Sequence, residues 1–174
     1  DFRQQMLRAQ PSYLDAIIMT HEHNDHTAGL DDVRPYNFMR RQDMPIYSEP
    51  RVADAFRERF PYVFDKEPYP GAPMVRLHTI SAEASFQVAD MEIIPIRIMH
   101  GRLPILGFRV DDFAYLTDVK TIPSEEFAKL ENLHTLVINA LHHNVHFTHM
   151  NLEESLTMIE RIRPKRTFLT HLSH

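Results

Sequence analysis

The sequence LDAIIMTHEHNDHTAGL, residues 14–30, decides how this chain is interpreted. It opens with a short apolar run, over 14–20, which predicts a buried strand that leads into a loop. The loop places three imidazoles and two carboxylates within six residues, 21–26. A solvent-exposed polar loop is the alternative interpretation, but it leaves the clustering of three histidines unexplained. We therefore interpret this loop as a functional site.

The residue types in this loop are those that bind first-row metal ions. Imidazole nitrogen and carboxylate oxygen are both ligands of zinc, manganese and iron. A tight loop can turn His21 and His23 toward one ion, and Asp25 and His26 toward a neighbouring ion. The motif therefore predicts a site for two metal ions.

Composition limits the class of protein further. The chain has 174 residues, with 43% apolar and 25% charged residues, which is typical of one soluble globular domain. Its net charge of -5 argues against a nonspecific nucleic-acid binder and against a binder of anionic membranes. The absence of Cys excludes disulfides and thiolate metal sites within this segment. No apolar run reaches the roughly 18 to 20 residues that a membrane span needs.

The rest of the chain alternates between strand-like and helix-like patterns. We expect strands over 14–20, 45–48, 74–80, 86–88, 91–99, 105–110, 113–116, 134–139 and 166–170. We expect a short helix over 25–30, with Pro35 and Pro45 interrupting anything longer there. We also expect helices over 49–59 and 151–163, and a short one that begins at Ser124. The chemically active residues fall on loops just after strands, where α/β proteins place their sites.

The residues in and after the ligand-rich loop resemble a known family. The segment 20–30 resembles the His-x-His-x-Asp-His motif of the metallo-β-lactamase superfamily. Within it, the segment GLDDVR, 29–34, resembles the PhnP-like phosphoribosyl cyclic phosphodiesterases, which are relatives of the tRNA 3′-processing nucleases. The resemblance implies an α/β fold, the αββα sandwich of that superfamily. The segment DFR, 1–3, resembles the end of the family's GPDFR segment, so several tens of residues of amino-terminal β structure would precede Asp1. We therefore expect residues 1–174 to be one hydrolase domain, truncated at both ends.

The resemblance also assigns metal ligands farther along the chain. By their order and flanking residues, His100, Asp118 and His171 resemble the remaining ligands of the family. The family's ligand sets, carried onto this sequence, are His21, His23, His100 and Asp118 for the first ion, and Asp25, His26, His171 and Asp118 for the second.

Two more histidines receive roles from the resemblance. His149 matches the position at which PhnP-like members use a histidine against the substrate phosphate, so we interpret it as catalytic and not as a ligand. The alternative is a helix-capping or surface histidine, and His142, His143 and His146 are weaker candidates. His174 resembles the histidine that joins cysteines of an early loop around an additional structural zinc. Either those cysteines lie outside residues 1–174, or this branch has lost the site.

The resemblance implies a phosphodiesterase that uses a hydroxide held between two divalent ions, zinc or manganese. Two such ions, two aspartates and a hydroxide leave a net positive site that suits a phosphodiester monoanion, such as a ribose cyclic phosphate. Asp25 would also help to orient the nucleophile. The alternatives are a thioesterase, a lactamase or a tRNA-processing nuclease of the same fold, and a metal-dependent sensor without turnover. We further expect a cytoplasmic protein with a small phosphodiester substrate, no nucleic-acid or membrane partner, and the dimeric state common among relatives.

Overall fold

The computed structural model describes residues 2–173 and is an α/β structure. The chain divides into two compact units, the first ending at Ser81 and the second beginning at Ala82. Each unit contains one β-sheet with its own helices, and each is described by itself below. The expectation of one domain over residues 1–174 stays a prediction. Within residues 2–173, no helix is both long enough and apolar enough to cross a membrane.

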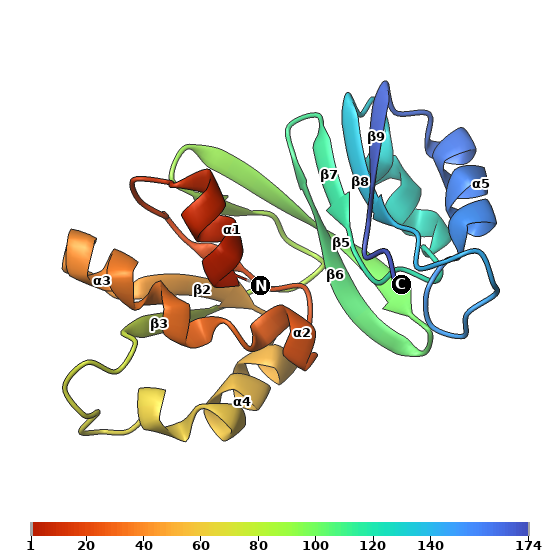
Figure 1. Ribbon diagram of the computed structural model, residues 1–174. Helices are drawn as coiled ribbons and strands as arrows, with labels where there is room; N and C mark the ends of the chain where they lie inside the picture. Colours follow the sequence, from red (N-terminus) through yellow and green to blue (C-terminus); the bar gives the residue numbers. More distant parts are fainter. Residues whose placement is uncertain (1, 174) are drawn as a thin grey trace. The chain divides into compact units, whose positions relative to one another are not determined.

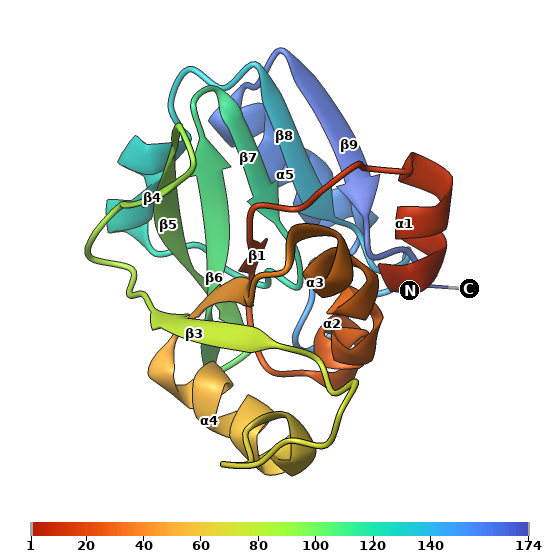
Figure 2. The ribbon, with the colours of Figure 1, turned by 90° about the vertical axis from the view of Figure 1, so that its left-hand side faces the viewer.

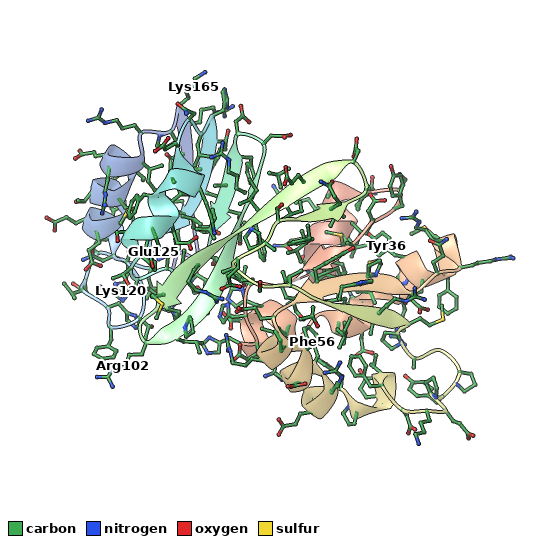
Figure 3. The ribbon with its side chains drawn as sticks, turned by 180° about the vertical axis from the view of Figure 1, so that it is seen from behind. Tyr36, Phe56, Arg102, Lys120, Glu125 and Lys165 are labelled. Carbon is green, nitrogen blue, oxygen red and sulfur yellow. The ribbon has the colours of Figure 1, made fainter. Side chains whose placement is uncertain are left out.

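The first unit is built on a parallel three-stranded sheet in the order β1-β2-β3, of which Figure 1 labels β2 and β3, lying side by side. Its strands are β1 (Ile17–Ile18), β2 (Met44–Ser48) and β3 (Val75–Thr79), and its helices are α1 (Phe2–Ala9), α2 (Asn24–Thr27), α3 (Arg34–Arg40) and α4 (Pro50–Arg59), with short 3₁₀ turns at Leu30–Val33 and Pro61–Val63. The central strand has a buried side, on which Ile46 is fully covered. Tyr36 of α3 and Phe56 of α4 belong to the core cluster that includes Ile46 (Figure 3).

Prolines lie in the first turn of two helices in this unit. The short helix expected to open over 25–30 does not run on through Pro35: α2 ends at Thr27, and a separate helix that was not predicted, α3, begins at Arg34. Pro35 lies in the first turn of α3, where a missing N–H leaves no helical hydrogen bond unmade and the fixed φ suits the helix. Pro50 occupies the same place in α4, as the helix expected over 49–59 requires. The helix α1 was not predicted, and the first strand is shorter than the expected 14–20.

The second unit is built on a six-stranded sheet in the order β4-β5-β6-β7-β8-β9 (Figure 2). Its strands are β4 (Phe86–Val88), β5 (Met91–His100), β6 (Leu103–Val110), β7 (Phe113–Leu116), β8 (Thr135–Asn139) and β9 (Arg166–Thr170), and its helical elements are the 3₁₀ helix η3 (Ser124–Leu130) and α5 (Leu152–Ile162). The pairs from β4 to β7 are antiparallel, whereas β7, β8 and β9 are parallel. The strands β5, β7, β8 and β9 therefore all run in the same direction.

The helix α5 covers this sheet and begins where the sequence predicts. Asn151 caps it: its side chain accepts a hydrogen bond from Glu154 N, and the Glu154 carboxylate accepts one from Asn151 N, both at 2.9 Å. Apolar residues of α5 pack against the core cluster that includes buried residues of β7 and β8. This packing fixes the loop between β8 and α5, which carries His149.

Candidate metal centre

The first unit supplies its candidate ligands from one loop, residues 20–27, here called the ligand loop. The loop follows β1 directly and includes the short helix α2. His21 is fully buried, and its ring centroid lies 4.6 Å from that of His23 and 4.4 Å from that of His26. The motif therefore folds into a compact cluster of imidazoles.

Neighbouring side chains orient this cluster. Thr20 Oγ1 lies 3.0 Å from His21 Nδ1, so one ring nitrogen of His21 is held by the loop itself. Metal-binding histidines are commonly oriented in this way through the nitrogen that does not bind the metal. Asp25 Oδ2 lies 3.2 Å from His26 Nε2, which places the two expected ligands of the second ion side by side.

The second unit gathers its candidate ligands from several strand ends. His100 is the last residue of β5, while Asp118 and His171 follow β7 and β9. Because these strands run in the same direction, their carboxyl ends meet at one edge of the sheet. His149, from the loop after β8, joins them there. The histidines and the aspartate, far apart in sequence, thus form one cluster within this unit.

Distances within the second cluster are short enough for shared metal binding. Asp118 Oδ1 lies 2.7 Å from His171 Nε2 and 3.2 Å from His149 Nε2. One ligand atom from each of Asp118, His149 and His171 can be chosen so that all lie within 4.8 Å of one another. The ring of His149 lies 5.0 Å from that of His171 and 4.5 Å from that of His100. The geometry also admits His149 as a ligand, so its catalytic role stays a prediction.

Two of these residues have an uncommon backbone conformation. Asp118 has φ of 57° and His171 has φ of 55°, both in the left-handed region, which Asp and His adopt more readily than most residues other than Gly. Asp118 is also almost fully buried, at 1% exposure.

A glycine lets the loop that carries His149 approach β5 closely. His100 Nδ1 lies 3.0 Å from Thr148 O, so the nitrogen that can donate is held by this loop. Gly101 has φ of 63°, and a Cβ atom added there would lie 2.8 Å from Thr148 Cγ2. A larger residue at position 101 would push the loop away from His100. Sequence analysis did not single out Gly101 or Thr148.

Burial governs the ionisation of His149. Loss of hydration lowers its pKa to about 4, because burial and the neighbouring histidines His100, His171 and His146 outweigh the attraction of Asp118 for its protonated form. In the metal-free chain this imidazole is therefore neutral at pH 7. Its Nδ1 lies 3.0 Å from Thr148 Oγ1 and 3.1 Å from His146 Nδ1.

The remaining histidines of the sequence analysis differ in their placement. His146 contacts His149 directly, and the ring of His142 lies 5.7 Å from that of His146. The exposed His143 contributes its carbonyl to Asn151. His174, assigned to an additional structural zinc, lies outside the described residues. That assignment stays a prediction.

The donor set fits divalent metal ions. Both clusters consist of imidazole nitrogen and carboxylate oxygen, which are the ligands that zinc and manganese share. Each unit also holds one histidine nitrogen through a side-chain or backbone oxygen, as metal-binding histidines require. The structure describes every ligand predicted for the two ions, and it brings those of each unit together within that unit.

Comparison with known proteins identifies the family. The sequence matches the beta-lactamase superfamily domain over residues 1–172. It is 45% identical over 175 residues to an octanoyltransferase of Porphyromonas gingivalis, covering 100% of this chain and 35% of that protein. A crystal structure of a diphosphatase of the PhnP family has a TM-score of 0.91 and 36% identity, covering 100% of this chain and 66% of that one. Human tRNase Z, short form, has a TM-score of 0.72 and 20% identity, covering 99% of this chain and 78% of that one, and shows the fold alone.

The chain belongs to the metallo-β-lactamase superfamily. The predicted fold class and the resemblance to PhnP-like members are confirmed. The chain spans about a third of the length of the octanoyltransferase and about two thirds of the diphosphatase. The activity, the substrate and the partners of the whole protein are therefore proposed, not shown, by these comparisons.

Proposed function

We propose that this protein is a metal-dependent phosphodiesterase with two divalent ions. The observation that carries the proposal is the close approach of two expected ligands, Asp118 and His171, whose Oδ1 and Nε2 atoms lie 2.7 Å apart at one edge of the sheet. The likeness of the chain to a diphosphatase of the PhnP family, at 36% identity, supports phosphoryl chemistry over the other reactions of the fold.

In this proposal the ligands carried over from the family hold the two ions. These are His21, His23, His100 and Asp118 for one ion, and Asp25, His26, His171 and Asp118 for the other. Two such ions, when bound, lower the pKa of water and stabilise charge on the oxygens of a phosphoryl transfer. Either zinc or manganese suits these ligands, and supply in the cell decides between them.

His149 would act on the substrate and not as a ligand. Because burial keeps it neutral at pH 7, it can donate a hydrogen bond through only one ring nitrogen. When Nδ1 accepts from Thr148 Oγ1, the proton lies on Nε2, the nitrogen that faces Asp118. A donor at this place can stabilise the charge that builds on a phosphoryl or leaving oxygen. We assign Asp25 the further role of orienting the attacking oxygen.

The proposed substrate is a small phosphodiester, such as a ribose cyclic phosphate. The net charge of -5 supports a small anionic substrate held by metal ions over a long nucleic acid held by basic side chains. We propose a cytoplasmic location and a homodimer on the strength of the resemblance to PhnP-like members.

One assay separates the reaction classes. The full chain, loaded with manganese or zinc, would be tested on bis(p-nitrophenyl) phosphate, on p-nitrophenyl phosphate and on an octanoyl thioester, each with and without chelator. The proposal predicts turnover of the diester that the chelator abolishes. Chelator-insensitive turnover, or turnover of the monoester alone, would contradict it.

A thioester hydrolase is the second candidate. The observation that favours it is the 45% identity to a protein named octanoyltransferase, of which this chain spans 35%. An enzyme that handles octanoyl groups acts on acyl esters or thioesters, and metal-bound sites of this fold can serve either reaction. Turnover of the octanoyl thioester, with none of the diester, would favour this candidate.

A further inference from the structure

Two arginines of α4 bind the ligand loop within the first unit. Arg51 Nη1 donates to Glu22 Oε1. Arg59 Nη1 donates to Glu22 O at 2.9 Å and also to Thr27 Oγ1. Thr27 Oγ1 in turn donates to His23 O at 3.1 Å. The arginines thus bind the side chain and the backbone of Glu22 and, through Thr27, the far end of the loop. The helices α2 and α4 lie next to each other in both views (Figures 1 and 2).

The helix that carries these arginines is firmly held. Val52, Ala53 and Phe56 of α4 are all buried, at 4% exposure or less. Arg51 and Arg59 stand eight positions apart, which is about 12 Å along a helix. They therefore approach the loop from opposite ends of one rigid element, and the loop takes its position from that element.

The residue that these arginines bind, Glu22, lies within the metal-binding motif itself. Glu22 lies between two expected ligands, His21 and His23, and its carboxylate is itself a metal-binding group. Its side chain is only 22% exposed and is directed to Arg51. The ion pair thus keeps this carboxylate out of the ligand set and sets the backbone on both sides of it.

We propose that Arg51 and Arg59 are positioning residues that hold the ligand loop ready for metal binding. The inference rests on the proposed function, because it presumes that the loop binds metal. Ordering of ligands before binding reduces the entropy lost when the ion binds. Groups that orient ligands in this way commonly account for a 10- to 100-fold difference in metal affinity.

Charge and positioning predict opposite results when Arg51 is removed. The variant Arg51→Ala leaves the Glu22 carboxylate without its cation, and the added negative charge alone would strengthen the binding of a divalent cation. Loss of positioning would weaken binding. The direction of the change in metal affinity therefore separates the two effects.

The test is a calorimetric titration of the metal-free full chain with Mn²⁺, and separately with Zn²⁺. We expect Arg51→Ala and Arg59→Ala to raise the dissociation constant by about 10- to 100-fold. The variant Arg51→Lys keeps the charge but loses the planar guanidinium, and it should give an intermediate loss. Thermal unfolding of the metal-free variants checks that each is folded. If Arg51→Ala does not fold, the dissociation constant of Arg51→Lys decides the test.

The matched control is Arg57→Ala on the same helix. Arg57 is more than half exposed and pairs with Asp54 at 2.8 Å, in an i, i+3 surface pair. Its removal should leave the dissociation constant within about twofold, as expected for a weak exposed pair. Equal or tighter metal binding by Arg51→Ala and Arg59→Ala, with normal binding by the wild type, would overturn this inference and leave the proposed function intact. Failure of the wild type to bind either metal would overturn both.

Discussion

The two units supply their candidate ligands in different ways. In the first unit, His21, His23, Asp25 and His26 lie within six consecutive residues of one loop. In the second, His100, Asp118 and His171 are spread over more than seventy residues and meet only because β5, β7 and β9 end at the same edge of a sheet. The first set depends on local loop geometry, and the second depends on correct strand pairing across the whole unit.

This difference predicts where the site is most sensitive to mutation. The loop of the first unit is held by side chains of α4, which can be removed one at a time. The ligands of the second unit are placed by the ends of different strands, and two of them, Asp118 and His171, have left-handed backbone. Changes in the second unit should therefore have the larger effects on activity and on folding.

The largest effect is expected from Asp118→Ala. This residue is the proposed ligand of both ions and lies 2.7 Å from His171 Nε2. Its loss should abolish detectable diester turnover and lower the metal content of the protein, measured by elemental analysis. A variant that keeps its full metal content and its activity would contradict the assignment.

His149→Ala should lower turnover by about 10²- to 10⁴-fold, the usual range for a general acid or base. If His149 is catalytic and not a ligand, the metal content should stay unchanged. Steady-state kinetics and metal analysis of the same sample check both points. A fall in bound metal would reassign His149 as a ligand, which its position 3.2 Å from Asp118 Oδ1 also permits.

Gly101→Ala tests the close approach in the second unit. The left-handed φ of 63° alone costs about 1–2 kcal/mol for a residue with a Cβ atom. The contact of 2.8 Å with Thr148 Cγ2 should add to this loss in the free energy of unfolding, measured by urea denaturation. The double variant Gly101→Ala, Thr148→Ser removes that methyl group and should recover part of the loss. Equal stability of Gly101→Ala and the wild type would show that the loop moves freely.

The smallest effect concerns the pH dependence of stability. Burial alone would raise the pKa of Glu154, but hydrogen bonds from Lys120 Nζ and Asn151 N outweigh it and hold the pKa below its usual value of 4.5. The ionised carboxylate therefore stabilises the fold above pH 4.5, and this contribution is lost as the pH falls through the lowered pKa. Glu154→Gln should reduce the acid sensitivity of the urea midpoint below pH 4.5. An unchanged pH profile would show that the pair with Lys120 contributes nothing.

Much of the fold could be predicted from local sequence patterns. The helix over 151–163 was recognisable because Asn151 is a strong cap, and the hairpin strands were marked by apolar runs on either side of Asp111 and Asp112. The helix α3 was missed because Pro35 was interpreted as a breaker when it starts a helix. A proline can either end a helix or occupy its first turn, and the residues that follow it decide which.

The contiguous motif made the first ligand set visible in the sequence, whereas the second was found only through the family resemblance. No local pattern indicated that Arg51 and Arg59 hold Glu22, because they lie 29 and 37 positions away from it. Nor did the sequence indicate the left-handed backbone of Asp118 and His171. Contacts between distant segments are set by tertiary packing, which residue types alone do not encode.

The proposed function assigns the two ligand sets carried over from the family to one pair of ions, and electron paramagnetic resonance of the manganese-loaded full chain tests that proposal most directly. The account predicts two Mn²⁺ per chain and a spectrum of two exchange-coupled ions. It also predicts that the coupled signal is lost both in His23→Ala, in the first unit, and in Asp118→Ala, in the second. A spectrum of isolated Mn²⁺ at one ion per chain, or a coupled signal that survives either substitution, would contradict the account.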